Sequence, residues 1–224
     1  MRPFTPLVFL AVLCCAAPAL SQDREIRYAV IGDSYSSGEG ATPEQSWPAL
    51  LARHLHDDGL QIKLVANPSR TGWTTQDALD EEMPIFRTSR PDFATVQIGV
   101  NDWVRGVTAS RFRKNFVLLL EEMLAVLPEK KKLLVVTIPD FSVTPSGSTF
   151  GEPPEISRGI SEFNKIIEQE AATRGLKVAD VFPLSQKMRG DSALVAADGL
   201  HPSAKEYALW EKLIFPVSRD LLAR

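Results

Sequence analysis

Arg27-Tyr28-Ala29-Val30-Ile31-Gly32-Asp33-Ser34 is the stretch that decides the fold, because an apolar run ends there at a glycine and a serine follows almost at once. Such a run predicts a buried strand, and the carboxyl end of a strand is where parallel α/β sheets place their chemistry. A serine becomes a nucleophile only with a base, an orienting acid and oxyanion donors. Three later segments offer such groups: 67–72, 99–102 and 198–201.

The apolar runs and helical patterns alternate along the chain. Short runs that are rich in Val and Ile predict strands over 28–32, 62–66, 93–98, 133–138 and 177–180. Amphipathic spacing predicts helices between these strands, and a last helix from about Ser203, whose hydroxyl can cap it. The alternation predicts a three-layer α/β/α sandwich with a doubly wound, five-stranded parallel sheet in the flavodoxin-like order 2-1-3-4-5.

One segment breaks this alternation. Residues 141–154 contain three prolines and two glycines and show no period. We therefore expect a surface loop near the active face of the sheet.

The N-terminal segment indicates export. Residues 7–17 are an unbroken apolar run after a short positive end, and small residues follow at 19 and 21, which is typical of a secretory signal peptide over 1–21. A membrane anchor needs about 20 apolar residues, so the run is too short for one. We expect a single domain over 22–224, secreted or periplasmic, with no integral membrane segment after signal removal.

Composition excludes several classes of protein. Both cysteines, Cys14 and Cys15, lie in the predicted signal, so the mature chain has no disulfide, catalytic thiol or cysteine-ligated zinc. A formal net charge of -3 gives no electrostatic case for nucleic acid. We expect no metal and no cofactor.

The polar segments are informative through their joint placement. Gly-Asp-Ser, Asn-Asp and Asp-Gly are each ordinary turn signals, and Asp33 fits a simple helix cap. However, Ser34 follows the first predicted strand, Gly72 the second, Asn101 the third and the pair of Asp198 and His201 the fifth. The carboxyl ends of parallel strands converge at one crevice, so these residues are expected to meet.

The four segments resemble, in order and residue type, those of the SGNH hydrolases, also called the GDSL esterase and lipase family. The resemblance runs from Tyr28 to about residue 215, and Asp198-Gly199-Leu200-His201-Pro202-Ser203 is similar to the last family motif. It implies an oxyanion hole formed by Ser34, Gly72 and Asn101. Pro68 and Trp73 depart from the commoner residues of the second motif.

The base follows by elimination among three histidines. His54 and His56 lie on the helix expected after the nucleophile loop, where a surface role is the simpler interpretation. His201 remains, and Asp198 three residues earlier can fix its tautomer, as in a serine triad of chain order Ser, Asp, His.

Substrate contacts are less well defined by the sequence. Trp73 and Trp103 each directly follow or nearly follow an oxyanion residue and are candidate substrate contacts, although tryptophan is also an ordinary core and rim residue. Arg70 and Arg105 fit an acidic substrate group or, more simply, solvated loop charge.

These observations predict an exported serine esterase that hydrolyses carboxylic esters through a covalent acyl-enzyme, on a small-molecule or glycan ester. Two alternatives stay open. The same site permits a carbohydrate deacetylase that acts on acetylated polysaccharide. A catalytically silent binding module of the same fold is the other, and it is disfavoured because every catalytic residue type is present.

Overall fold

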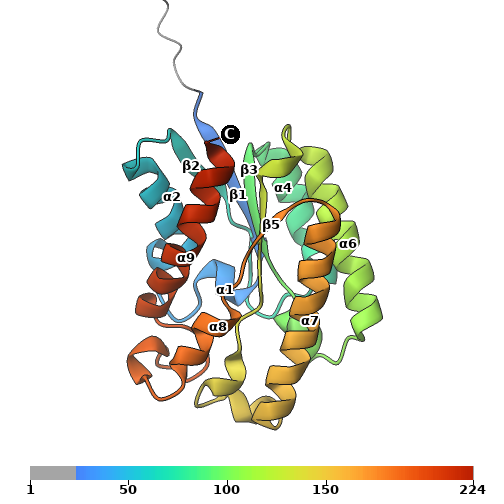
Figure 1. The fold of residues 1–224 in the computed structure, drawn as a ribbon, viewed down its shortest axis with the longest axis vertical. Helices are drawn as coiled ribbons and strands as arrows, with labels where there is room; N and C mark the ends of the chain where they lie inside the picture. The colour runs from blue at the N-terminus through green and yellow to red at the C-terminus, as the bar shows by residue number, and fades with distance from the viewer. Residues whose placement is uncertain (1–23, 224) are drawn as a thin grey trace, which may run out of the picture.

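The computed structural model describes residues 24–223, so the predicted signal peptide over 1–21 lies outside the described residues. One five-stranded sheet runs through the molecule (Figure 1). Its strands pair in parallel throughout, in the order β2-β1-β3-β4-β5. This confirms the predicted topology. The strands are β1 (Ile26–Gly32), β2 (Ile62–Ala66), β3 (Phe93–Gln97), β4 (Leu133–Val136) and β5 (Lys177–Ala179).

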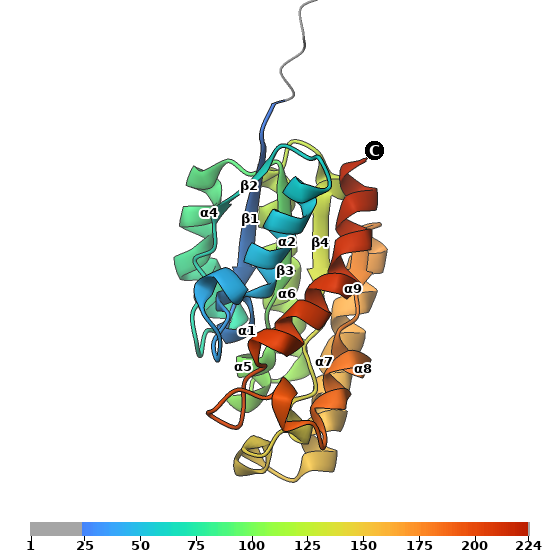
Figure 2. The ribbon, with the colours of Figure 1, turned by 90° about the vertical axis from the view of Figure 1, so that its left-hand side faces the viewer.

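Helices cover both faces of the sheet and complete the predicted three layers. On one face lie α2 (Trp47–Asp57) and α9 (Ala204–Leu222), and on the other lie α4 (Met83–Ser89), α6 (Ala109–Val126) and α7 (Pro153–Thr173) (Figures 1 and 2). Shorter elements sit mainly at the strand ends: α1 (Ser34–Ser37), η1 (Pro43–Gln45), α3 (Thr75–Asp77), η2 (Ala78–Glu82), α5 (Val100–Val104), η3 (Lys130–Lys132), η4 (Phe141–Val143), η5 (Gly147–Phe150), α8 (Phe182–Ser185), η6 (Gln186–Met188) and η7 (Ser192–Leu194).

The core lies between the sheet and these two helix layers. Every residue of β3 is buried, because helices cover both faces of a central parallel strand. Trp47 of α2 is fully buried, and its indole N–H donates to Gln97 Oε1 at 2.9 Å. On the other face Phe112 of α6 stacks on Phe163 of α7, with ring centroids 4.3 Å apart. Helix α2 is therefore bonded directly to the central strand β3, and α6 and α7 pack against each other on the opposite face.

The last helix begins where its cap was expected. The Ser203 hydroxyl accepts the backbone N–H of Glu206, and the helix continues through Pro216 to Leu222. Because Ser203 follows His201 by two residues, the start of α9 fixes the end of the loop that carries the histidine.

The segment 141–154 differs from its prediction. It forms two 3₁₀ turns, η4 and η5, and its last two residues already belong to α7. Phe141 and Ser142 are buried, so the expectation of a surface loop is wrong for the first part of the segment. The cause is Asp140, a buried carboxylate at the end of β4 that accepts the Ser142 N–H and hydroxyl and draws the chain inward.

Candidate active site

Ser34 is the first residue of the short helix α1, directly after β1. Asp33 caps this helix, and its Oδ1 accepts the Tyr35 N–H at 3.0 Å, which confirms the simple capping interpretation of that residue. Behind the turn, the Gly32 N–H donates to Oε2 of the fully buried Glu82 at 3.0 Å. The backbone on both sides of Ser34 is therefore held by a carboxyl group.

Three carboxyl groups are buried close to this turn. Burial raises the pKa of Asp33 to about 8. The hydrogen bond from the Tyr35 N–H opposes this shift, and the charge of Asp102 adds to it. Burial also raises the pKa of Glu82 well above its usual range. The pKa of Asp102 is raised by the same cause, although two hydrogen bonds from Thr75 oppose it. The floor of the site therefore holds acids that retain protons more strongly than exposed carboxyl groups do.

The loop that contains Gly72 is bound to the helix that contains Asn101. Asn101 Nδ2 donates to the carbonyl oxygen of Trp73 at 2.9 Å, and Arg105 donates to the carbonyl oxygen of Gly72 at 2.5 Å. The buried Asp102 accepts the N–H and hydroxyl of Thr75 at 2.8 and 2.5 Å. These bonds fix the loop that follows β2 against the helix that follows β3.

Gly72 itself has φ of +85°, in the left-handed region that favours glycine. A side-chain amide carries two N–H groups, and the bond to Trp73 uses one from Asn101. The second N–H is available to a ligand atom.

His201 and Asp198 form a close pair. His201 Nδ1 lies 2.7 Å from Asp198 Oδ2, while Asp198 Oδ1 accepts the N–H groups of Leu200 and His201 at 2.8 and 3.0 Å. Burial opposes the charge on Asp198, but these hydrogen bonds together with the imidazole outweigh it and lower the pKa of the carboxyl group. The carboxylate is thus ionised where it meets the ring.

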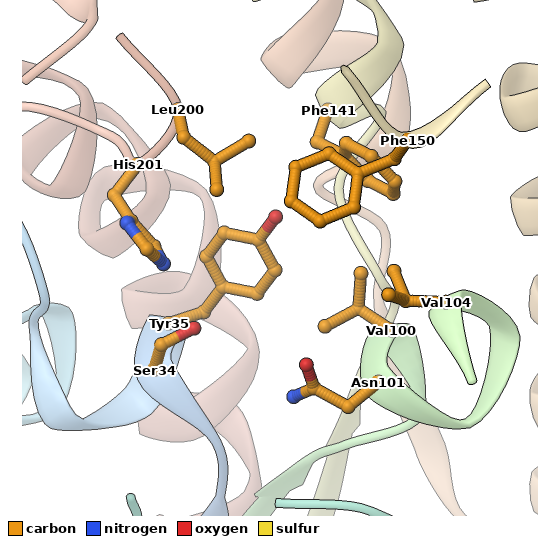
Figure 3. Close-up of a pocket in the computed structure, with 9 residues that line it drawn as sticks. All are labelled: Ser34, Tyr35, Val100, Asn101, Val104, Phe141, Phe150, Leu200 and His201. Atoms are coloured by element: carbon orange, nitrogen blue, oxygen red, sulfur yellow. The ribbon is translucent and has the colours of Figure 1, made fainter. Parts of the chain in front are cut away.

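Figure 3 shows the His201 ring directed toward Ser34 across the mouth of a cavity. Within residues 24–223 the serine hydroxyl and the imidazole are not hydrogen-bonded to each other, as nucleophile and base often are not before substrate arrives. The remaining ring nitrogen, Nε2, therefore faces the serine while Nδ1 faces the carboxylate.

The cavity has a volume of about 50 Å³. Three predicted site residues line it, namely Ser34, Asn101 and His201. The rest of the wall is mostly apolar and comes from α1, α5, η4, η5 and the 198–201 loop: Tyr35, Val100, Val104, Phe141, Phe150 and Leu200 (Figure 3). Such a space suits a small apolar or weakly polar group next to the serine hydroxyl.

Gly72 and Asp198 do not line the cavity. Neither Trp73 nor Trp103 lines it. Trp103 stands behind Phe141, edge to face with ring centroids 6.0 Å apart, and Arg70 covers the Trp73 ring at 5.4 Å. The role of the two tryptophans as substrate contacts stays a prediction.

The other candidate side chains have structural partners. Arg105 holds the Gly72 carbonyl, which is a more specific role than solvated charge. His54 contacts Glu211 Oε1 at 2.8 Å and stacks on Phe215, so it is a surface histidine of α2 that faces α9.

Sequence reasoning missed two aspartates that shape the site. The sequence pointed to Asn101 and gave no role in the site to its neighbour Asp102, which fixes the Gly72 loop through Thr75. Asp140 binds Ser157 of α7 and Gln186 of η6 in addition to Ser142, and so anchors the segment that carries Phe141 and Phe150. The available signal was its position at the carboxyl end of β4, where the other strands carry site residues.

Two further properties concern residues 24–223. No set of three or more His, Cys, Asp or Glu side chains is placed there to hold a metal ion. No helix in that range has the length and apolar character needed to span a membrane.

A model of the GDSL-like lipase/acylhydrolase family matches residues 30–209. Esterase TesA of Pseudomonas aeruginosa is 25% identical over 211 residues, which cover 93% of this chain and 96% of that protein. Thioesterase 1/protease 1/lysophospholipase L1 of Escherichia coli is 30% identical over 124 residues, 55% of this chain and 53% of that protein.

A solved structure, the family 3 carbohydrate esterase of Clostridium thermocellum, has a similar fold, with a TM-score of 0.70 and 20% identity. The alignment covers 89% of this chain and 98% of that one.

Proposed function

The chain belongs to the GDSL-like lipase/acylhydrolase family and is an ester-hydrolysing enzyme, and from this premise we propose that Ser34, Asp198 and His201 are a catalytic triad that acts through a covalent acyl-enzyme. The observation that carries the proposal is the His201 imidazole, which contacts Asp198 through Nδ1 and faces Ser34 with its other nitrogen (Figure 3). This is the arrangement that a serine nucleophile requires.

The proposed reaction proceeds in two halves. Ser34 Oγ attacks the carbonyl carbon of the ester while its proton passes to His201 Nε2, and the carbonyl oxygen becomes an oxyanion. The intermediate collapses, the C–O bond to the alcohol breaks, and His201 returns the proton to the departing oxygen. Water then attacks the acyl-enzyme, gives a proton to His201, and releases the carboxylic acid as Ser34 recovers its proton.

The oxyanion is proposed to accept hydrogen bonds from the Ser34 N–H, the Gly72 N–H and the free N–H of Asn101. Support comes from the bonds that join the Gly72 loop to α5, since they fix two of these donors relative to each other. Fixed donors stabilise charge that appears in the transition state without any cost of reorganisation.

Replacement of the nucleophile tests the proposal. Ser34→Ala is expected to abolish ester hydrolysis and labelling by a phosphonate ester, while the melting temperature stays near that of the wild type. Ser37→Ala is the matched control, because Ser37 lies on the same short helix and its hydroxyl bonds the Ser34 carbonyl oxygen. Labelling of Ser34→Ala at the wild-type rate contradicts the assignment.

A carbohydrate deacetylase is the second candidate. The cavity of about 50 Å³ favours a small acyl group such as acetyl, and a carbohydrate esterase shares the fold. Assays with acetylated xylan and with an aryl acetate distinguish the two functions. Release of acetate from xylan at a rate comparable to that from the aryl ester supports the deacetylase. Hydrolysis of the aryl ester alone supports a small-molecule esterase.

Export is proposed from the sequence of residues 1–21 alone. Cleavage near Gln22 would leave a single domain over residues 22–224 in the periplasm or medium. Intact-mass measurement of the protein from a fractionated culture is the test, and a product that keeps Met1 in the cytoplasmic fraction contradicts the proposal.

A further inference from the structure

The cavity beside Ser34 holds one polar group that the proposed reaction does not use, the hydroxyl of Tyr35. Tyr35 is 4% exposed, and its ring packs edge to face against His201 and Trp210. Figure 3 shows its hydroxyl directed into the cavity, between Leu200 and Phe150 and away from Ser34.

This hydroxyl is unlike those of two other buried tyrosines. The Tyr28 hydroxyl is hydrogen-bonded to Thr95 Oγ1 at 2.8 Å, and the Tyr207 hydroxyl donates to the Glu39 carbonyl oxygen at 2.8 Å. Among residues 24–223 no group is hydrogen-bonded to the Tyr35 hydroxyl. The Tyr35 oxygen is not one of the buried side-chain atoms that lack a partner, so it is open to the cavity and free to bond a ligand.

The surroundings of the hydroxyl are apolar on the side away from the catalytic pair. Val100, Val104, Phe141 and Phe150 form that side of the cavity (Figure 3). Burial raises the pKa of Tyr35 well above its usual range, so the hydroxyl keeps its proton at ordinary pH and can donate it to an acceptor. Apart from Asn101, whose amide is assigned to the oxyanion, a group that enters this side of the cavity therefore meets one hydrogen-bonding partner in an otherwise apolar wall.

The reaction geometry decides which part of an ester enters there. His201 has to protonate the leaving oxygen, so the alcohol lies on the histidine side of the bond that breaks. The acyl chain then extends to the opposite side, toward Phe141 and Phe150 (Figure 3). The Tyr35 hydroxyl is consequently placed to contact the acyl group rather than the alcohol.

The size of the cavity limits the acyl chain. Its volume is about 50 Å³, which suits an acyl chain of only a few non-hydrogen atoms. Phe150, edge to face with Phe141 at 5.7 Å, closes the outer end and is itself 41% exposed. Longer chains have to displace this ring or leave the cavity.

We propose that this cavity selects short acyl groups that carry a hydroxyl or keto oxygen, which the Tyr35 hydroxyl binds. The inference rests on the proposed role of Ser34 as nucleophile, which sets the direction of the acyl chain. A 3-hydroxybutyryl group fits both conditions, since it has four non-hydrogen atoms beyond its carbonyl carbon and one of them is oxygen. A site that bonds a substrate oxygen rejects the apolar isostere, because the group of the protein is then left unpaired.

The test compares two ethyl esters of equal size, 3-hydroxybutyrate and 3-methylbutyrate, by titration of the acid released. The wild type is expected to prefer the hydroxy ester. In Tyr35→Phe the ratio of the two kcat/KM values should fall about tenfold or more, with kcat/KM for 3-methylbutyrate rising. Tyr28→Phe is the matched control, because it removes a buried hydroxyl that bonds Thr95, and it should leave the ratio unchanged.

Two results overturn the inference. A wild-type ratio near one that Tyr35→Phe does not alter shows that the hydroxyl does not contact the acyl group. A Tyr35→Phe effect that instead distinguishes 3-hydroxybutyl acetate from 3-methylbutyl acetate shows that the alcohol occupies the cavity. Hydrolysis that persists in Ser34→Ala is a different result: it refutes the catalytic proposal and with it the direction assigned to the acyl chain, whereas the ester ratios in Tyr35→Phe report by themselves which group the hydroxyl contacts.

Discussion

His201 Nδ1 lies 2.7 Å from Asp198 Oδ2, and the other oxygen of the same carboxylate accepts the His201 backbone N–H. One side chain therefore holds both the ring and the peptide of the histidine. The side chain of His201 is 12% exposed and that of Asp198 is 40% exposed, so the pair lies at the surface end of the cavity. This contact makes the tautomer of the ring directly testable.

Asp198→Asn should lower kcat by a factor on the order of 10³ to 10⁴, with the fold retained. The amide oxygen can still accept the N–H groups of Leu200 and His201, but an NH₂ group then faces Nδ1 and favours the tautomer that protonates Nε2. That nitrogen can no longer accept the serine proton. Steady-state kinetics with a melting curve check this outcome, and a kcat that changes only severalfold would show that the carboxylate merely shapes the loop.

Asn101→Ala should lower kcat by about a hundredfold to a thousandfold and change KM little, since its amide faces charge that develops at the barrier. Asn101→Asp should be at least as damaging, because a carboxylate opposes the oxyanion. The bond from Asn101 to the Trp73 carbonyl oxygen is also lost in Asn101→Ala, so thermal unfolding must be measured in parallel. Lost stability with near-normal turnover indicates that Asn101 only ties the loop.

Gly159→Ala should destabilise the protein although alanine favours helices. A Cβ at position 159 of α7 would lie 1.8 Å from the indole nitrogen of Trp103, which stands behind Phe141. Overpacking of this kind costs about 1–3 kcal/mol, which exceeds the gain of roughly 1 kcal/mol in helix propensity. The displaced wall should also reduce kcat/KM for short esters.

A double-mutant cycle with Trp103→Leu measures this contact by denaturant unfolding. The smaller side chain should remove most of the cost of Gly159→Ala, and Glu162→Ala on the exposed side of α7 serves as the control. If Gly159→Ala lowers the free energy of unfolding by the same amount in the wild type and in Trp103→Leu, the strain does not come from the contact with Trp103.

The sheet and much of the candidate site could be predicted because their signals are local. Asp198 and His201 are three residues apart and share one loop, so their contact follows from the chain itself. Ser34 and Asn101 each follow a strand, and parallel strands bring those ends together. Such inferences need the topology but no knowledge of side-chain packing.

The parts that could not be predicted depend on packing between distant segments. Glu82 ends a π-helical turn, and the extra residue of that turn shifts the helical spacing of apolar side chains. Glutamate is also rarely found fully buried, so a carboxyl group that bonds Gly32 in the core was not expected. The segment with Phe141 and Phe150 has no period, so the burial of its first residues could be recognised only from the contacts of Asp140. The walls of the cavity are therefore known from the structure, whereas the groups proposed to react there were visible in the sequence.

The stability of the protein should fall as pH rises from about 4 to about 8, in part because of Asp33. Burial raises the pKa of Asp33 to about 8 in the folded chain, against 3.8 as its ordinary value. Below the lower value both states are protonated, and the contribution of the group to stability is fully present. Between the two values the unfolded chain releases the proton and the folded chain keeps it, so the free energy of unfolding falls by up to about 1.4 kcal/mol per pH unit from this group.

Asp33→Asn isolates that contribution, because the amide oxygen can accept the same Tyr35 N–H and carries no charge at any pH. Its free energy of unfolding should depend less steeply on pH between about 5 and 8 than that of the wild type, as measured by urea denaturation at each pH. Asp57→Asn, at an exposed position of α2, should follow the wild-type curve. Parallel curves for the wild type and Asp33→Asn would mean that Asp33 is ionised in the folded protein. The proton retained beneath Ser34 would then belong to Glu82 or Asp102, the other two carboxyl groups whose pKa values burial raises.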